Sequence, residues 1–328
     1  MMVKVGIVGT NWITERFLEA ALTVEGFELS AVYSRTEAKA KEFANKYDVT
    51  HIFTDLEVMA SSCEIDAVYI ASPNSLHCEQ SLLFLRQKKH VLCEKPIASN
   101  LKELEKMIEA AKENNCLLME AMRSTVTPSF LNIKNNIHKI GKVRRIFASY
   151  CQYSSRYDKY KEGVVLNAFK PEFSNGSIMD LGVYCLHPVV ALFGKPTEIK
   201  GTAYLLPSGV DGEGSVLLKY DEMDGVIMHS KVTNSFLPSE IQGEEGNMII
   251  NQISTPTDVK IHYRDGRVED ISVNQQENDM YYEAKEFINL IKQNKTESEL
   301  NSFLQSKTVM EIVDQVRKQV GLNYLADN

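Results

Sequence analysis

The sequence predicts two domains: an α/β domain with a parallel sheet (residues 1–122), then an α+β domain with an open, mainly antiparallel sheet (residues 123–328). Three observations lead to this fold class. A chain of 328 residues is longer than one hydrophobic core usually supports. Up to Met122, short apolar runs alternate with helical patterns, which is typical of βαβ units. Beyond Met122, apolar runs follow one another with only turn residues between them, which favours antiparallel pairing.

The first domain is expected to contain five strands that are covered on both faces. Their sequences are rich in Val, Ile, Leu and Tyr and lack the strict alternation of a half-buried strand. Helical patterns occupy residues 36–47 and 100–115, and the second begins with Asn100 three residues before Glu103, a capping-box-like start. The five expected strands are 3–9, 27–34, 66–72, 89–95 and 116–121.

The second domain is expected to consist mainly of strands, interrupted by one apolar helix over residues 178–194. Gly194 and Pro196 stop this helix. The pair Asp265-Gly266 predicts a tight hairpin, and the tail 276–320 is helical in pattern. The expected strands are 143–153, 197–206, 214–220, 225–233, 246–253, 258–264 and 267–273.

Composition argues against several classes of partner. The net charge of -8 disfavours nucleic acid, because phosphate binding needs clustered Lys and Arg. The six cysteines form no CxxC pair, which predicts free thiols in a reducing compartment and no metal site. No basic leader precedes Val3, and no apolar run approaches the roughly 18 residues of a membrane span. We therefore expect a cytoplasmic protein without a membrane segment.

The stretch GIVGTNWITERF (residues 6–17) has the order of strand, turn and helix that a Rossmann dinucleotide-binding turn requires. With Gly9 as the first position of G-x-G-x-x-G, Asn11 and Thr14 replace the other two glycines. Asn tolerates positive φ well, so we expect Asn11 in that conformation near the pyrophosphate. An ordinary βα turn capped by Thr10 or Asn11 is the alternative. The expected cofactor contacts in this turn are Gly9, Thr10, Asn11, Trp12 and Ile13.

The second expected strand ends in Ser34-Arg35, close to where NAD-binding folds place an acidic residue for the ribose hydroxyls. A carboxylate would repel the 2′-phosphate of NADP, whereas Arg35 would attract it. The sequence therefore favours NADP(H) over NAD(H), with Ser34 and Arg35 as contacts. The alternative is a capping box between Ser34 and Glu37, with Arg35 solvated.

Two further strand ends carry polar residues at the edge where an open parallel sheet binds its ligand. One begins at Ser72, after the third expected strand, and the other is Glu94-Lys95-Pro96, after the fourth. In the second, the proline restricts Lys95 to an extended conformation that can direct its ammonium towards the ligand. A solvent-exposed loop is the alternative. The expected cofactor contacts at the two ends are Ser72, Pro73, Asn74, His77, Glu94 and Lys95.

The apolar helix 178–194 carries a polar stripe. Asp180, Tyr184 and His187 stand at i, i+4 and i+7 and so share one face of an ideal α-helix. Such a stripe needs partners or a cavity. Taken singly, Tyr184 could pack in the core with its hydroxyl bonded outward, and His187 could be a satisfied buried imidazole. Together with Lys95 the three residues predict a catalytic site.

These motifs together resemble the glucose-fructose oxidoreductase, inositol dehydrogenase and MocA (Gfo/Idh/MocA) family. The resemblance covers nearly the whole chain: a Rossmann domain, Glu94-Lys95-Pro96 after a strand, and a D-x-G-x-H/Y helix before an antiparallel sheet. Tyr184 is similar to the residue of the dimeric dihydrodiol dehydrogenase and glucose-fructose oxidoreductase branches. Asn11, Thr14 and His187 depart from the family pattern.

The resemblance implies hydride transfer between NAD(P) and an alcohol or carbonyl carbon of a sugar, polyol or cyclic diol. It implies Lys95, Asp180 and Tyr184 as catalytic residues, with Tyr184 donating a proton in the reductive direction while Lys95 polarises the carbonyl oxygen. His187 and Arg123 are candidates for binding this small-molecule substrate.

Two further expectations concern function and assembly. The alternative function is a catalytically inactive dinucleotide-binding sensor or regulator of the same fold, although retention of Lys95 and Tyr184 favours catalysis. An open antiparallel sheet commonly leaves one side uncovered, so we also expect a homodimer or a larger homo-oligomer through that face.

Overall fold

The computed structural model describes residues 1–328, and the chain forms two compact units. Unit 1 comprises Met1–Arg123 and Gln276–Phe303, and unit 2 comprises Ser124–Gln275 and Leu304–Asn328. The sequence placed all of residues 123–328 in one domain, whereas the structure returns 276–303 to the first unit. The physical reason is that α9 (Met280–Lys292) packs against α1 (Trp12–Ala21).

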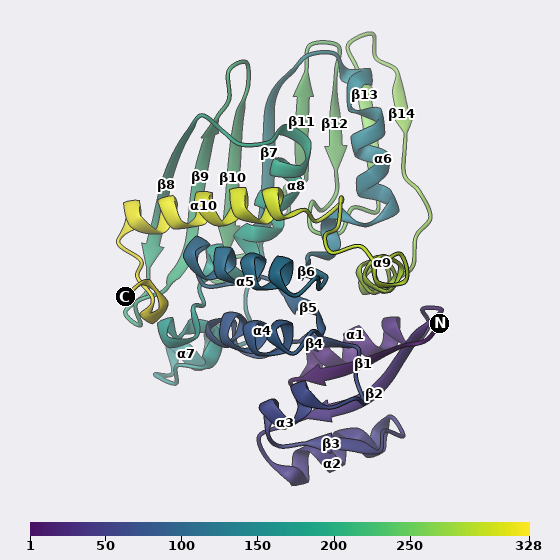
Figure 1. The fold of residues 1–328 in the computed structure, drawn as a ribbon. Helices are drawn as coiled ribbons and strands as arrows, with labels where there is room; N and C mark the ends of the chain where they lie inside the picture. The colour runs from purple at the N-terminus through teal and green to yellow at the C-terminus, as the bar shows by residue number, and fades with distance from the viewer. The chain divides into compact units, whose positions relative to one another are not determined.

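Unit 1 is built on a six-stranded parallel sheet in the order β3-β2-β1-β4-β5-β6 (Figure 1). This is the doubly wound order, with its reversal between β1 and β4. The five expected strands are present, and β3 was missed because it has only three residues. The strands are β1 (Val3–Val8), β2 (Phe27–Tyr33), β3 (His51–Phe53), β4 (Ala67–Ile70), β5 (His90–Glu94) and β6 (Leu118–Ala121).

Helices connect these strands, and their ends follow the capping residues of the sequence. Asn100 caps α5 by accepting from the Glu103 amide at 2.9 Å, and the Glu103 carboxylate accepts from the Ser99 amide at 2.9 Å. The alternative capping box of Ser34 is not formed, because Thr36 occupies the N-cap of α2. The remaining helical elements of unit 1 are α2 (Glu37–Lys46), α3 (Leu56–Ser61), η1 (Asn74–Leu76), α4 (His77–Arg86) and α5 (Leu101–Glu113).

Unit 2 is built on an eight-stranded sheet in the order β14-β13-β12-β11-β7-β10-β9-β8. Only β7 and β10 pair in parallel, so the expectation of a mainly antiparallel sheet is confirmed. The sequence missed β11, because its five residues contain a single large apolar side chain. The strands are β7 (Val143–Cys151), β8 (Glu198–Leu205), β9 (Asp211–Lys219), β10 (Asp224–Ser230), β11 (Ser239–Gly243), β12 (Gly246–Ile250), β13 (Val259–Tyr263) and β14 (Val268–Asp270).

Helices cover one face of this sheet. In Figure 1, α8 (Val183–Phe193) and α10 (Phe303–Val320) lie across β7 to β10. Gly201 of β8 admits the Val316 side chain of α10, since a Cβ at Gly201 would lie 2.6 Å from it. The other helical elements are η2 (Arg123–Thr125) at the crossing between the units, α6 (Pro128–Asn136), η3 (Ile137–Ile140), α7 (Tyr157–Lys161), η4 (Asn167–Phe169), η5 (Pro171–Phe173), the π-turn η6 (Ile178–Gly182) and η7 (Leu325–Asp327).

Two local expectations for the chain are confirmed. All six cysteines are free thiols. Asp265-Gly266 forms the turn between β13 and β14, with Gly266 at a φ of 89° and its amide donating to the Tyr263 carbonyl at 3.0 Å.

The expectation that no apolar run approaches the length of a membrane span is wrong. The helical stretch Pro171–Phe193 is long and apolar enough to cross a membrane by length and composition. However, 78% of the most apolar part of this stretch is buried inside the protein. Because the core helix of a soluble protein has the same properties, this helix is only weak evidence for a membrane segment.

The prediction that Asn11 adopts positive φ is also wrong. Asn11 has a φ of -108° and is the N-cap of α1, where its Oδ1 accepts from the amides of Ile13 at 2.9 Å and Thr14 at 3.4 Å. Gly9 takes the positive φ instead, at 107°, and a Cβ there would lie 2.7 Å from the Ala71 carbonyl oxygen. Since the chain reverses at Gly9, Asn11 is left in the extended conformation of a cap.

We expect Asn11→Ala to destabilise unit 1. The change removes the cap of α1 and the bond from Asn11 Nδ2 to the Ala71 carbonyl at 2.8 Å. Loss of such a cap typically costs about 1–2 kcal/mol in the free energy of unfolding, which urea denaturation measures. Thr36→Ala is the matched control, because Thr36 caps α2 without a side-chain hydrogen bond. Equal losses in the two variants would contradict the capping role of Asn11.

Candidate active site

The turn after β1 exposes backbone donors at the N-terminus of α1. The Asn11 side chain occupies the amides of Ile13 and Thr14. The amides of Thr10, Asn11 and Trp12 have no acceptor within the chain. Unpaired amides at a helix N-terminus bind anions, because they donate hydrogen bonds and lie at the positive end of the helix dipole. This turn is therefore suited to a pyrophosphate.

Ser34 and Arg35 follow β2 at the same end of the sheet. Ser34 is buried, and its amide donates to the Phe53 carbonyl of β3 at 3.2 Å. Arg35 is exposed and has no ion-pair partner in the chain. No carboxylate stands at the end of β2 to oppose a phosphate group. An unpaired guanidinium at this position can hold the 2′-phosphate of NADP.

His77 connects the segments that follow β4 and β5. Its ring is buried, with Nδ1 2.9 Å from the Pro96 carbonyl oxygen and Nε2 2.9 Å from the Ser72 carbonyl oxygen. The direct cofactor contact that the sequence predicted for His77 is therefore corrected, because no atom of the residue is exposed and both nitrogens face backbone. His77 instead supports Ser72 and the Glu94-Lys95-Pro96 segment.

Glu94 is buried, and its carboxylate accepts hydrogen bonds from Tyr69 and from the backbone of Lys95. Tyr69, stacked on Phe17 with ring centres 3.8 Å apart, donates its hydroxyl to Glu94 Oε1 at 2.5 Å. Glu94 Oε2 accepts from the Lys95 amide at 3.2 Å, and Lys95 is joined to Pro96 by a cis peptide bond. Burial raises the pKa of Glu94, although the hydroxyl of Tyr69 and the charge of Lys95 oppose this effect.

Arg123, a predicted substrate residue, forms an ion pair with the buried carboxylate of Asp279 at the start of α9. Arg16 contacts the other oxygen of Asp279 at 3.3 Å. Glu283, one turn further along α9, is fully buried and neither carboxylate oxygen has a hydrogen-bond partner. Burial, and then the charge of Glu94, raises the pKa of Glu283 well above its ordinary value. Sequence reasoning missed this acidic group because α9 is distant in the chain.

The polar stripe of the second unit departs from an ideal α-helix. Asp180 lies in the π-turn η6, whereas Tyr184 and His187 lie in α8, so the spacing of 3.6 residues per turn does not apply between them. Tyr184 is 7% exposed and packs edge-on against Tyr150 with ring centres 5.6 Å apart. His187 is 1% exposed, with Nδ1 3.2 Å from Gln305 Nε2. The structure thus places His187 in the core.

Asp180 forms an ion pair that sequence reasoning missed. Lys231 Nζ lies 2.7 Å from Asp180 Oδ2, and the lysine side chain is 3% exposed against 36% for the aspartate. Lys231 follows β10 inside a run that was predicted only as a strand, so nothing in the local pattern marked it as functional.

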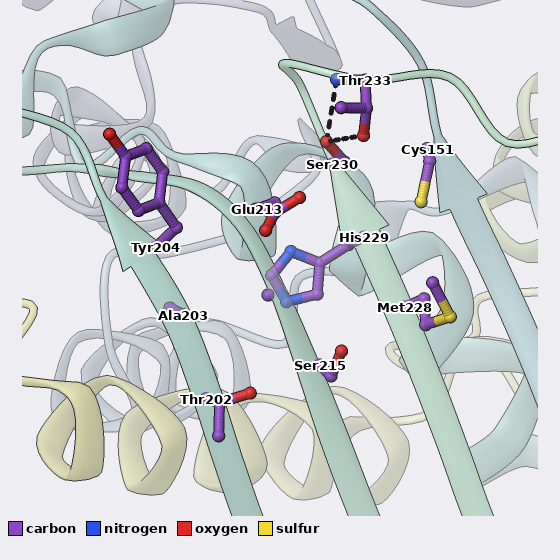
Figure 2. Close-up of a pocket in the computed structure, with 11 residues that line it drawn as sticks. Cys151, Thr202, Ala203, Tyr204, Glu213, Ser215, Met228, His229, Ser230 and Thr233 are labelled. Atoms are coloured by element: carbon purple, nitrogen blue, oxygen red, sulfur yellow. Dashed lines mark hydrogen bonds between the residues drawn. The ribbon is translucent and has the colours of Figure 1, made fainter.

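A hollow of about 360 Å³ opens on the sheet of unit 2 and holds none of the predicted site residues. Figure 2 shows Thr202 and Tyr204 of β8 beside Glu213 and Ser215 of β9, with Thr233 bonded to Ser230. His229, drawn among them, is buried and accepts or donates a bond with Ser177 at 2.9 Å. Burial lowers the pKa of His229 to about 3, which makes it unsuitable as a base near neutral pH.

Comparison with known proteins places these features in a family. A family model described as "Oxidoreductase family, NAD-binding Rossmann fold" matches residues 3–122, and one described as "GFO/IDH/MocA C-terminal domain" matches residues 136–249. The chain is 56% identical over 326 residues to scyllo-inositol 2-dehydrogenase (NADP(+)) IolU of Bacillus subtilis (strain 168), covering 99% of each protein. The chain belongs to the Gfo/Idh/MocA family.

The chain is also similar, at lower identity, to a further curated protein and to solved structures. Trans-1,2-dihydrobenzene-1,2-diol dehydrogenase of Danio rerio is 30% identical over 352 residues, with 100% of each chain covered. The solved structure of KijD10, a 3-ketoreductase from Actinomadura kijaniata in complex with NADP and TDP-benzene, has a TM-score of 0.85 at 22% identity and 98% coverage of both chains. This structure supports the fold of the chain. Identity to the inositol dehydrogenase exceeds that to the dihydrodiol dehydrogenase, although Tyr184 resembles the latter branch.

We expect buried His229 to make the folded protein less stable as the pH falls. The unfolded residue binds a proton near its ordinary pKa of 6.5 and the folded one only near 3, so this residue lowers stability as the pH falls between these values. His229→Gln should therefore lose less stability on acidification than the wild type, measured as the urea midpoint across this window.

Asp211, 3.8 Å from His229, provides a control of opposite sign. Burial raises the pKa of Asp211 to about 6, so the folded state holds a proton that the unfolded state releases, and stability increases as the pH falls towards 3.8. Asp211→Asn should lose stability more steeply on acidification than the wild type. Identical pH slopes in all three proteins would contradict both assignments.

Proposed function

We propose that this protein is an NADP-dependent oxidoreductase that transfers a hydride between the cofactor and a ring CH–OH carbon of a cyclic polyol of the inositol class. The observation that carries the proposal is the 56% identity, over 99% of both chains, to an NADP-dependent scyllo-inositol 2-dehydrogenase. A dihydrodiol dehydrogenase relative at 30% identity keeps cyclic diols as a second substrate class to be tested.

The residues of unit 1 fit NADP(H). The unpaired amides of Thr10, Asn11 and Trp12 are suited to the pyrophosphate, and Arg35 to the 2′-phosphate. Ser34, Ser72, Pro73, Asn74 and Glu94 remain proposed contacts at the same edge of the sheet. NADP(H), when bound, supplies or accepts the hydride.

The protein must move a proton when the hydride moves. In the oxidative direction Tyr184, as the phenolate, would accept the hydroxyl proton of the substrate, and in the reductive direction its hydroxyl would donate that proton back to the substrate oxygen. Lys95 contributes positive charge that stabilises negative charge on the substrate oxygen. Asp180 orients the reacting groups as a hydrogen-bond acceptor. His187 and Arg123 remain candidates for binding the substrate. In the structure His187 contacts Gln305, and Arg123 forms an ion pair with Asp279.

We also infer a compartment and an assembly. Six free thiols suit a reducing compartment such as the cytoplasm. The face of the unit 2 sheet that carries the hollow of Figure 2 also exposes Leu217 and Tyr204, at 53% and 57%. Exposed apolar side chains on an open sheet suit self-association as a homodimer or a larger homo-oligomer.

Tyr184→Phe and Lys95→Met are each expected to lower kcat for NADP-dependent oxidation of scyllo-inositol by about 10²–10⁴-fold, because a proton carrier or its charge partner is lost. The assay follows NADPH absorbance with purified protein. Tyr204→Phe is the matched control, since this exposed tyrosine makes no hydrogen bond through its hydroxyl. Cofactor binding without turnover of any polyol or diol in the wild type would instead favour a sensor.

Arg35→Ala is expected to weaken NADP(H) selectively. Loss of a charge-assisted contact worth about 1.5–3 kcal/mol raises the KM for NADP by about 10- to 100-fold and leaves the KM for NAD nearly unchanged. Lys41→Ala is the control, because this exposed lysine pairs with Glu37 on the same helix. An equal change for both cofactors would remove the assignment of Arg35 to the 2′-phosphate.

A further inference from the structure

Lys231 is a buried cation that the proposed chemistry does not use directly. Its side chain is 3% exposed, and its ammonium lies 2.7 Å from Asp180 Oδ2. We infer that Lys231 is a positioning residue: its ammonium holds the Asp180 carboxylate in its reactive orientation before substrate binds. This inference rests on the proposed function, because Asp180 matters only if the site is catalytic.

The backbone of Lys231 is held from two sides. Its amide donates to the Gly212 carbonyl at the start of β9 at 2.8 Å. Its carbonyl accepts from the Ser154 amide, in the segment after β7, at 2.8 Å. The lysine therefore extends from a point that neighbouring segments of the same sheet determine, rather than from a mobile loop.

The ammonium is equally constrained. Besides Asp180, it donates to the Ala168 carbonyl at 3.2 Å and lies 5.3 Å from the ring centre of Phe169, within the range of a cation–π contact. Asp180 is the one carboxylate within ion-pair distance of this ammonium. The position of the cation is thus determined by the fold, and the cation in turn determines where Asp180 Oδ2 lies.

The unequal exposure of the two partners favours positioning over simple stabilisation. A buried lysine paired with a carboxylate often contributes little net stability, because desolvation offsets the attraction. Here the lysine is buried while more than a third of the aspartate side chain is exposed. The pair therefore presents a carboxylate of fixed direction at the surface of unit 2. Small errors in the placement of a reacting group can cost about 10²-fold in rate.

The inference is tested with Lys231→Met and Lys231→Arg, assayed with scyllo-inositol and NADP. We expect Lys231→Met to lower kcat/KM by about 10- to 100-fold, while the affinity for NADPH, measured by fluorescence, stays at the wild-type value. Lys231→Arg should recover part of the loss, because a guanidinium can also bind a carboxylate. Lys195→Met, which removes an exposed lysine that pairs with Glu311, is the matched control and should retain wild-type activity.

A double-mutant cycle separates positioning from a merely structural role. If Lys231 acts through Asp180, then adding Lys231→Met to Asp180→Asn should lower kcat/KM by less than about twofold beyond Asp180→Asn alone. If Lys231 only supports the local structure, the two losses should multiply. The cycle measures thermal unfolding of all four proteins in parallel, so that a variant that fails to fold is recognised and Lys231→Arg then carries the comparison.

The outcomes distinguish the inference from the proposed function. A wild-type protein that oxidises scyllo-inositol, together with a Lys231→Met variant of unchanged kcat/KM or with multiplying losses, overturns the inference alone. A wild-type protein that binds NADPH and turns over no polyol or diol overturns the proposed function and the inference with it. Non-additive losses with unchanged NADPH affinity support both.

Discussion

Hydrogen bonds from two side chains connect the carboxyl ends of β1, β4 and β5, at the edge of the unit 1 sheet where we propose that NADP(H) binds. Asn11 joins the end of β1 to the Ala71 carbonyl after β4. His77 joins the Ser72 carbonyl to the Pro96 carbonyl after β5. Because Gly9 has no side chain, the first of these turns can approach Ala71 closely. The turn after β1 and the Glu94-Lys95-Pro96 segment are therefore both hydrogen-bonded to the segment that follows β4.

This network has a chemical peculiarity at His77. Both ring nitrogens face carbonyl oxygens, yet a neutral imidazole carries a single N–H and can donate to only one of them at a time. Burial lowers the pKa of His77, while the two carbonyl contacts oppose this effect. His77 is thus a buried residue whose hydrogen bonds to the backbone depend on its protonation.

In unit 2, too, a side chain from a distant segment holds a residue of the proposed site. The π-turn that carries Asp180 interrupts regular helical spacing, and a buried lysine from a strand end compensates by holding the carboxylate. His187, which an ideal helix would place beside Asp180, is drawn into the core by its contact with Gln305 of α10. Which polar side chains of this segment are exposed is therefore decided by packing between α8, α10 and the sheet.

Most of the elements could be predicted from the sequence, because hydrophobic periodicity reflects the local requirement for burial. The misses have physical causes. The strands β3 and β11 are too short or too polar to show a hydrophobic period. Asn11 was expected at positive φ but caps α1, because the chain reverses at Gly9. Two other features were missed because they depend on residues far apart in the chain, which local sequence patterns do not show. These are the packing of α9 in unit 1 and the pairing of Lys231 with Asp180.

The sequence by itself determined the two-domain fold class, the family and the chemical identity of Lys95, Asp180 and Tyr184, since these follow from residue types and their spacing. Tertiary structure alone decided which of the polar side chains are buried, as His77 and His187 are. It also decided which cation accompanies Asp180. Burial and pairing are properties of packed surfaces, and they arise only when distant segments meet.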